Sequence, residues 1–226
     1  MFNKEFLLLQ INDALFPIGG YSHSYGLETY IQKDILKNDD DIREYIDNRL
    51  KYSLKNTELL GVRLAYENAH NLSKLKELDE IMTVSKSPKE IRLASIRLGS
   101  RFIKTLKNCG IKADKNYFDE YAALNYTNKH HSISYGVVCR AAEIDIKSAL
   151  TTYIYAQCSA MITNCVKTVP LSQSKGQKML YESFDLMEKI VKDVLVMEEG
   201  EFCASAPAFD IRCMEHERLY SRLYMS

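Results

Sequence analysis

The sequence predicts an all-α protein, a single-domain helical bundle of about eight to ten helices with an irregular C-terminal tail. The 226 residues contain 9 Gly and 4 Pro, which is too few for the many turns of a β-sandwich or β-barrel. Several segments repeat apolar residues at helical spacing, and no stretch alternates apolar and polar residues between hairpin turns. Because no linker rich in Pro, Ser or Gly divides the chain, we expect one domain over residues 1–226.

The first unusual segment runs from Phe16 to Glu28, where glycine is concentrated. Its glycines are Gly19, Gly20 and Gly26. Glycine in such a cluster indicates a tight turn that brings the backbone close to another element. We expect a helix–turn–helix corner here, in which Ser22 or Ser24 caps the following helix.

Helical spacing is clearest over residues 88–107. Ser87 is the expected N-cap, with Pro88 in the first turn and Glu90 three residues after the serine, as in a capping box. Gly110 is expected to end this helix. An apolar stripe and a basic stripe run along it, formed by Ile91, Leu98, Phe102 and Leu106 and by Arg97, Arg101 and Lys104.

Four other segments also predict helices. Residues 40–56 open with acidic side chains, which suit the positive end of a helix dipole. Aromatic spacing predicts a short helix over 117–124, and longer apolar stripes predict helices over 146–168 and 172–197. The tail, about 198–226, is polar and aromatic, so we expect it to be irregular or conditionally ordered. It either binds a partner, because Tyr and Arg are favoured anchors, or docks back on its own bundle.

Charge limits the classes of partner. The chain has 30 Lys and Arg against 30 Asp and Glu, so its zero formal charge gives no drive toward nucleic acid or an anionic membrane. Residues 48–115 carry 15 basic and 7 acidic side chains, an excess of +8. This basic region is either a surface for an acidic partner or an ordinary solvated face, and we favour the second for any single residue.

Cellular location is predicted from the N-terminus and the cysteines. The first residues lack the features of a secretory signal peptide, and the 6 Cys contain no C-x-x-C pair. We therefore expect reduced thiols in a cytoplasmic protein. The longest uncharged stretch, 148–166, carries several polar residues and predicts a buried helix rather than a membrane span.

Two local groups could carry chemistry, and both signals are weak. The sequence has no P-loop, no G-x-G-x-x-G, no H-E-x-x-H and no G-x-S-x-G motif. Ser22 and His23 could form a nucleophile with its base, but adjacent side chains rarely meet in that geometry. Residues 215–217, Glu-His-Glu, could ligate a metal, but contiguous ligands seldom converge on one ion. We therefore expect neither a catalytic residue nor a metal site.

Three stretches, in order and spread over nearly the whole chain, resemble the urease accessory protein F (UreF) family. The first is P-x-G-G-[FY]-S-x-S-x-G-L-E, present as Pro17, Gly19, Gly20, Tyr21, Ser22, Ser24, Gly26, Leu27 and Glu28. The second is V-P-L-x-Q-x-x-G-Q, present as Val169, Pro170, Leu171, Gln173, Gly176 and Gln177. The third is H-E-x-x-x-S-R-L-[FY]-x-S, present as His216, Glu217, Ser221, Arg222, Leu223, Tyr224 and Ser226. Ser172 and Met225 depart from residues that are common in the family.

The resemblance implies an all-α, dimer-forming accessory protein that has no catalysis or cofactor of its own. Proteins of this family join the accessory protein UreD, called UreH in some species, and the GTPase UreG. That complex helps to place nickel, with a lysine carbamate derived from carbon dioxide, in the active site of apo-urease. The implied partner-binding residues are Tyr21, Ser22, Ser24, Glu28, Lys167, Gln173, Gln177, Arg222, Leu223 and Tyr224.

The resemblance also suggests individual roles. Arg222 and Tyr224 become ordered against UreD, and Tyr21 packs with the tail to form the surface that recruits UreG. The three residues around the second motif are either partner contacts or parts of a helix start and a turn, with equal weight; they are Lys167, Gln173 and Gln177.

Three rival functions remain open from the sequence. The chain could regulate GTP hydrolysis by inserting Gln173, Arg222 or Glu28 into the nucleotide site of the partner. It could be a hydrolase built on Ser22 and His23, or a direct nickel chaperone that uses residues 215–217 and free cysteines. We consider the hydrolase the least favoured.

Overall fold

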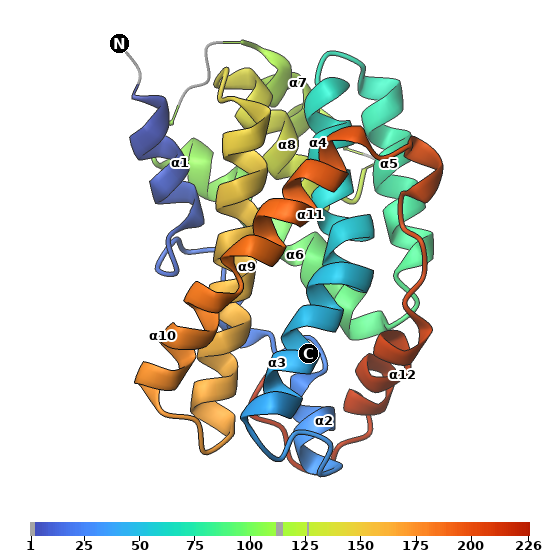
Figure 1. Cartoon of the computed structure of the whole chain (residues 1–226). Coiled ribbons are helices and arrows are strands. Elements are labelled where there is room, and N and C mark those ends of the chain that lie inside the picture. Colours follow the sequence, from blue (N-terminus) through green and yellow to red (C-terminus); the bar gives the residue numbers. More distant parts are fainter. Residues whose placement is uncertain (1–2, 112–114, 126) are drawn as a thin grey trace.

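A computed structural model describes residues 3–111, 115–125 and 127–226 of the chain. These residues form helices and no strands, which confirms the all-α class (Figure 1). The α-helices are α1 (Lys4–Asn12), α2 (Leu27–Gln32), α3 (Asp39–Asn48), α4 (Leu60–Glu67), α5 (Leu72–Ser85), α6 (Lys89–Asn108), α7 (Tyr117–Ala123), α8 (His131–Ala141), α9 (Ile146–Thr168), α10 (Gln173–Glu182), α11 (Phe184–Val196) and α12 (Pro207–His216). Two short 3₁₀ helices, η1 (Gly20–Ser22) and η3 (Glu199–Glu201), and a π-helical segment, η2 (Arg49–Leu59), complete them.

The helix predicted over 40–56 is part of a longer rod. It begins at Asp39, because Asn38 caps α3 in a capping box with Asp41. The backbone then stays helical through η2 and α4 to Glu67, so that α3, η2 and α4 run continuously along the bundle (Figure 1). No Pro or Gly interrupts the rod before Gly61, so the sequence offered no signal for an end near residue 56.

The predicted cap of the 88–107 helix is wrong, although the helix itself is confirmed as α6. Pro88 takes the cap position, and within the described chain no side chain accepts a hydrogen bond there. Glu90 does not complete a capping box, because its carboxylate binds His216 and Arg222 instead. The expected end is confirmed: Gly110 has a φ of 66°, and the amide of Ile111 donates to the carbonyl of Leu106.

The segment 172–197 forms two helices rather than one. α10 ends at Glu182 and α11 begins at Phe184, with Ser183 between them. The buried Ser183 hydroxyl donates to the carbonyl of Met179 at 2.8 Å. A serine that bonds the backbone in this way competes with the regular helical hydrogen bonds and favours a break.

The tail is more regular than expected. It contains α12, which starts with Pro207 at the first helical position and packs against α2 and α6. The expectation of an irregular tail therefore holds only for the residues outside η3 and α12.

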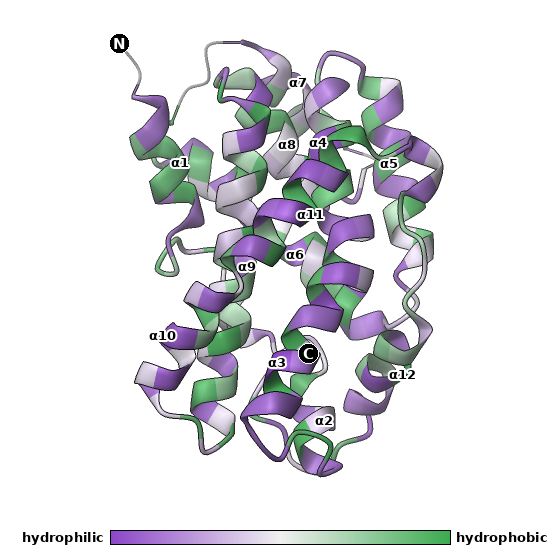
Figure 2. Cartoon of the chain, in the orientation of Figure 1, coloured by the Kyte–Doolittle hydropathy of each residue, from purple (hydrophilic) through white to green (hydrophobic). Residues whose placement is uncertain are grey.

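The helices pack around one hydrophobic core, and most of them carry both hydrophobic and hydrophilic residues (Figure 2). Two glycines permit close helix contacts. A Cβ on Gly99 of α6 would lie 1.8 Å from the carbonyl oxygen of Lys129, and one on Gly136 of α8 would lie 2.3 Å from that of Val62 in α4. The predicted helices over 117–124 and 146–168 are confirmed as α7 and α9. No described helix has the length and apolar character that a membrane span requires.

Candidate functional site

The glycine-rich segment after α1 forms the expected tight turn. Gly19 and Gly26 have φ angles of 84° and 81°, in the left-handed region that favours glycine. A Cβ on Gly19 would lie 2.4 Å from Nη1 of Arg101, and that nitrogen donates to the carbonyl of Ile18 at 3.3 Å. A Cβ on Gly26 would lie 2.8 Å from Sγ of Cys213 in α12. The turn is therefore pressed between α6 and α12.

Ser22 and Ser24 do not cap the next helix, so that expectation is wrong. Gly26 takes the cap position of α2, with no side-chain hydrogen bond from the described residues. The Ser22 hydroxyl donates to the carbonyl of Gly19 at 2.8 Å, and the buried Ser24 hydroxyl donates to the carbonyl of Ser226 at 2.8 Å. Both serines are used to shape the turn and to bind the end of the chain.

The turn also holds the last residues through its backbone. The amides of Ser24 and Tyr25 donate to the carbonyl of Ser226 at 2.5 and 2.8 Å. The amide of Met225 donates to the carbonyl of Ser22 at 2.8 Å. The first and third sequence motifs, which lie at opposite ends of the chain, therefore form one site.

Glu28 is the centre of this site. Its carboxylate is 5% exposed and accepts hydrogen bonds from the backbone amides of Leu223 at 2.7 Å and Tyr224 at 2.9 Å. It also contacts Nε2 of His216 at 3.0 Å. A buried carboxylate with three such contacts is well satisfied, and it fixes the course of the tail over α2.

A second carboxylate extends the network from α6. Nδ1 of the buried His216 lies 2.6 Å from Oε2 of Glu90, and Oε1 of Glu90 accepts a hydrogen bond from Arg222 at 2.6 Å. His216 therefore joins the carboxylate of Glu28 in α2 to that of Glu90 in α6. We call Glu28, Glu90, His216 and Arg222 the tail clasp.

The clasp holds the tail backbone but leaves several of its side chains free. Leu223 is 81% exposed, Tyr220 is fully exposed and Met225 is about half exposed. Arg222 is also exposed, although it is bonded to Glu90. Tyr224 is partly buried, and burial, followed by the nearby charge of Glu28, raises the pKa of its hydroxyl.

The second motif is built separately, on α9 and α10. Ser172 caps α10 by accepting a hydrogen bond from the amide of Lys175, so Gln173 does not act as the cap. A Cβ on Gly176 would lie 2.8 Å from Cγ2 of Val166, which shows how closely α10 packs on α9.

The three predicted residues of this region lie on the surface. Gln173 and Gln177 are exposed on α10, and Lys167 is exposed in the last turn of α9. Among the described residues, no hydrogen bond or ion pair links them to the tail. Tyr21 has its backbone in η1, and its side chain lies outside the part that the structure describes.

The Ser22–His23 pair does not have hydrolase geometry. Nδ1 of His23 lies 2.8 Å from Oγ of Ser226, whereas the Ser22 hydroxyl bonds Gly19. Burial, aided by the positive charges of Arg101 and Arg97, lowers the pKa of His23 to about 4. His23 is therefore a neutral, buried residue of the tail site at neutral pH.

The side chains of residues 215–217 do not converge on one point. Glu215 pairs with Lys33 and Arg212, His216 lies in the clasp, and Glu217 is exposed. Within the described ranges, no group of three or more His, Cys, Asp and Glu residues could hold a metal ion.

Sequence reasoning missed several residues of the site. Glu90 looked like part of a helix cap, and nothing local indicated a partner 126 positions away at His216. Asn164 of α9 donates to the carbonyl of His23 at 3.2 Å. It was missed because the sequence predicts its segment only as a buried helix. His216 had a signal, since it opens the third motif.

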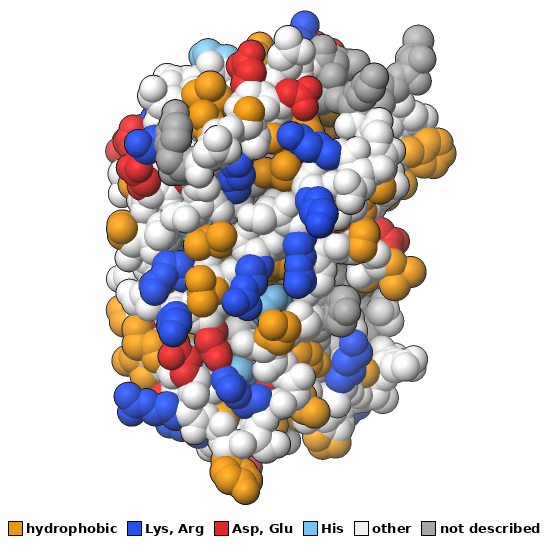
Figure 3. All heavy atoms as spheres, turned by 180° about the vertical axis from the view of Figure 1, so that it is seen from behind, with side chains coloured by type: hydrophobic (Ala, Val, Ile, Leu, Met, Phe, Trp, Pro, Cys, Tyr) orange, Lys and Arg blue, Asp and Glu red, His pale blue; other side chains and the backbone are white. Residues whose placement is uncertain are grey.

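The basic stripe of α6 is confirmed as an exposed face. Arg97, Lys104 and Lys107 are exposed and make no hydrogen bond or ion pair with other described residues. Lys104 and Lys107, with Lys129, line an open hollow of about 320 Å³. Several Lys and Arg side chains gather on the face that is seen from behind (Figure 3).

Comparison with known proteins gives a consistent result. The UreF family profile matches residues 36–184. The chain is 31% identical over 234 residues to the urease accessory protein UreF of Bacillus sp. strain TB-90, covering 99% of this chain and 100% of that protein. It is also 31% identical over 238 residues to the urease accessory protein UreF of Ureaplasma parvum serovar 3, covering 99% of both chains.

Proposed function

Because this chain belongs to the UreF family of urease accessory proteins, we propose that it is a non-catalytic scaffold for urease maturation. It joins UreD, or UreH, to the GTPase UreG in a complex that delivers nickel to apo-urease. In this proposal the protein is a cytoplasmic homodimer that needs no cofactor, nucleic acid or membrane for its role.

One observation carries the scaffold role: the tail is fixed by its backbone while its side chains point outward. Glu28 binds the amides of Leu223 and Tyr224, yet the Leu223 side chain is 81% exposed and Tyr220 is fully exposed. Exposed aromatic and apolar side chains on an ordered backbone are favourable anchors for a partner, because less conformational entropy is lost on binding.

The same geometry supports the following proposed roles for the predicted residues. Arg222, Leu223 and Tyr224 supply the partner surface of the tail, and Ser22, Ser24 and Glu28 hold that surface in position, with Tyr21 beside them in the chain. Gln173 and Gln177, with Lys167, form a second contact surface on α9 and α10. The two surfaces allow one chain to bind two different proteins.

Regulation of GTP hydrolysis is less favoured by the same contacts. Glu28 is buried under the tail, and Arg222 is bonded to Glu90, so neither side chain is free to enter a nucleotide site. Of the three residues suggested for this role, Gln173 is the one that is both exposed and without a side-chain hydrogen bond or ion pair in the described structure. A GTPase assay with UreG, with and without this protein, tests that role directly.

The scaffold proposal is tested by Leu223→Ser. Removal of an exposed side chain should leave the free energy of unfolding within about 0.5 kcal/mol of wild type. Loss of a partner anchor should weaken binding to UreD or UreH roughly tenfold, as measured by co-purification and titration. Light scattering on the same samples gives the number of copies of this chain and so tests the homodimer.

Val196→Ser is the matched control, because Val196 is 82% exposed and lies at the end of α11, away from the clasp residues. It should bind as the wild type does. If Leu223→Ser and Val196→Ser bind the partners equally well, the tail is not the anchor.

A further inference from the structure

Positive charge accumulates on the outer face of α6. Residues 91–111 contain five basic side chains and no Asp or Glu. Two of the five, Arg92 and Arg101, donate hydrogen bonds to backbone carbonyls of neighbouring segments. The other three are exposed over about 15 Å of the helix, since each residue adds about 1.5 Å along its axis. These three are Arg97, Lys104 and Lys107.

A close backbone contact adds Lys129 to this face. A Cβ on Gly99 would lie 1.8 Å from the carbonyl oxygen of Lys129, so glycine is what allows the segment before α8 to lie against α6. Lys129 has a φ of 53°, in the left-handed region that side chains other than glycine rarely adopt. Its Nζ donates to the carbonyl of Ala122 at 2.9 Å. The fold therefore holds a fourth cation beside Lys104 and Lys107, with which it lines the open hollow.

The hollow gathers like charges instead of separating them. Burial lowers the pKa of Lys129, and the positive charge of Lys107 lowers it further. The charge of Asp79 acts in the opposite direction, but this carboxylate is fully buried. Its two oxygens accept hydrogen bonds from the Tyr121 hydroxyl and from the amide of His130. Repulsion between lysines that the fold holds together costs free energy, and an anionic partner at the surface would offset it.

The lining of the hollow suits the side chain of a glutamate. Ser100 and Asn108, which are exposed at its edge, can donate hydrogen bonds to a carboxylate. Ile103, which is 7% exposed, offers an apolar contact to the methylene groups of such a side chain. None of the described residues that line the hollow is acidic or aromatic. A carboxylate would therefore meet lysine ammonium groups there without a competing negative charge.

We propose that the basic face, which comprises Arg97, Lys104, Lys107 and Lys129, binds an acidic segment of a partner protein and seats one of its carboxylate side chains in the hollow. Lys104 and Lys107 are about one helical turn apart, so an acidic helix with Glu at the same spacing presents its carboxylates at the height of these lysines. The proposal does not rest on the scaffold function, because no residue of the basic face belongs to the tail clasp or to the second motif.

A protein segment fits this face better than a nucleic acid does. Proteins that bind single strands stack bases on aromatic side chains, and the described lining of the hollow has no aromatic ring. The zero formal charge of the chain also gives no general attraction to a long phosphate backbone. A short acidic segment needs only the local charge of the basic face.

The test titrates a fluorescein-labelled peptide with the full chain at low salt and follows fluorescence anisotropy. The peptide is an Ala-based helix of about 20 residues with Glu repeated at a spacing of one turn, and its control carries Gln in place of Glu. The Glu peptide should bind saturably, and its affinity should fall several-fold at about 0.15 M salt, where the Debye length is about 8 Å. Equal anisotropy curves for the Glu and Gln peptides would mean that the basic face is only a solvated surface, and they would overturn the proposal.

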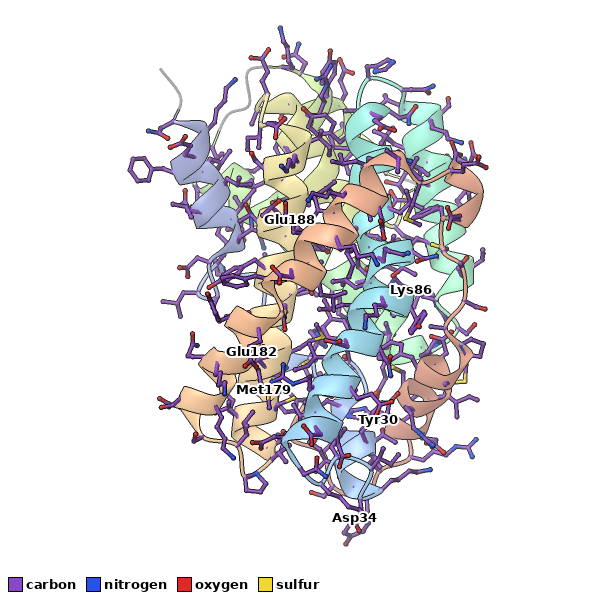
Figure 4. The ribbon with its side chains drawn as sticks, viewed as in Figure 1. Tyr30, Asp34, Lys86, Met179, Glu182 and Glu188 are labelled. Atoms are coloured by element: carbon purple, nitrogen blue, oxygen red, sulfur yellow. The ribbon has the colours of Figure 1, made fainter. Side chains whose placement is uncertain are left out.

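Charge reversals locate the binding. Lys104→Glu combined with Lys107→Glu should weaken binding of the Glu peptide about tenfold or more, because attraction becomes repulsion at two sites. Lys189→Glu combined with Lys192→Glu is the matched control, with the same spacing and the same change in net charge on exposed positions of α11. Lys192 pairs with Glu188, which lies at the front of the view in Figure 4, whereas α6 lies behind (Figure 1). Equal losses of affinity in the two double variants would show an effect of net charge alone and would contradict the assignment to the basic face.

Carbodiimide cross-linking of the wild-type chain to the same peptide provides a readout that needs no variant. The reagent activates a peptide carboxylate, which then forms an amide bond with a lysine amine. Digestion and mass spectrometry should find the cross-links at Lys104 and Lys107 in preference to Lys189. Cross-links spread evenly over the exposed lysines would overturn the proposal. Tighter binding of a DNA duplex of about 20 base pairs than of the Glu peptide, in the same salt, would overturn the choice of a protein partner.

Discussion

At the scale of single residues, Glu28 shows how one side chain joins distant parts of the sequence. It lies in the first turn of α2, directly after the glycine-rich turn, and contacts residues 216, 223 and 224. The family motifs identified both ends of this contact, but the residues alone did not show that they meet. A motif gives local spacing, whereas the pairing of Glu28 with the tail depends on how α2, α6 and α12 pack together.

Glu28→Gln should release the tail without unfolding the bundle. The amide keeps one carbonyl oxygen as acceptor, but its NH₂ group would face an amide N–H or His216. Loss of hydrogen bonds to a charged group costs about 1.5–3 kcal/mol each, so docking of residues 217–226 should weaken by about that amount. Hydrogen exchange of the amides of Leu223 and Tyr224 measures this directly.

Glu217→Gln is the control for that experiment, because Glu217 lies in the same segment but is exposed. Its exchange pattern should match the wild type. Unchanged protection of Leu223 and Tyr224 in Glu28→Gln would show that the clasp does not depend on the charge of Glu28.

At the scale of elements, the long amphipathic helices were predictable and their ends were not. Residues 146–168 are α9 with the predicted bounds, because a long apolar stripe dominates that segment. Ser87 is not the cap of α6 because Pro88 takes that position, and Glu90 does not complete a capping box because it bonds residues from α12 and the tail. Helix ends depend on single hydrogen bonds, and tertiary contacts can replace those bonds.

Close contacts between helices lead to a prediction for Gly136. A Cβ there would lie 2.3 Å from the backbone oxygen of Val62, and backbone atoms cannot move aside as a flexible side chain can. Gly136→Ala should therefore push α8 from α4 and lower the free energy of unfolding by about 3 kcal/mol. Urea denaturation followed by circular dichroism measures the change.

Gly200→Ala is the matched control, because nothing lies within 4 Å of a Cβ at Gly200. Its free energy of unfolding should stay within about 0.5 kcal/mol of wild type. Similar values for both variants would mean that α4 and α8 have room to separate.

At the scale of the whole molecule, burial of histidines links stability to pH. Burial lowers the pKa of His23 to about 4, of His130 to about 3 and of His131 to about 4. Below pH 6.5 the unfolded chain therefore binds more protons than the folded chain, and stability falls as the pH falls toward 4. Asp79 acts in the opposite direction, because burial raises its pKa to about 6 and the folded state takes up its proton first.

His131→Phe should reduce this loss of stability in acid. The imidazole is packed among the rings of Phe102, Tyr135 and Tyr153, and its Nε2 has no hydrogen-bond partner among the described residues, so a phenyl ring fits the space. The variant loses the 3.3 Å contact between Nδ1 and the Tyr153 hydroxyl. The test therefore compares the change in stability with pH and not its absolute value. Each unit of pKa depression corresponds to about 1.4 kcal/mol. The free energy of unfolding falls between pH 6.5 and pH 4.5 in both proteins. This fall should be smaller in the variant by at least 1 kcal/mol, which is roughly the contribution of one histidine.

Urea titrations at half-unit steps of pH measure the free energy of unfolding. His70→Phe is the control, because His70 is exposed and its replacement should leave the slope of that free energy against pH unchanged. Since the aromatic packing around residue 131 is independent of the clasp, the experiment separates core protonation from release of the tail. Parallel profiles for wild type and His131→Phe would mean that folding does not lower the pKa of His131. Acid sensitivity would then arise from the other two histidines whose pKa is lowered, His23 and His130.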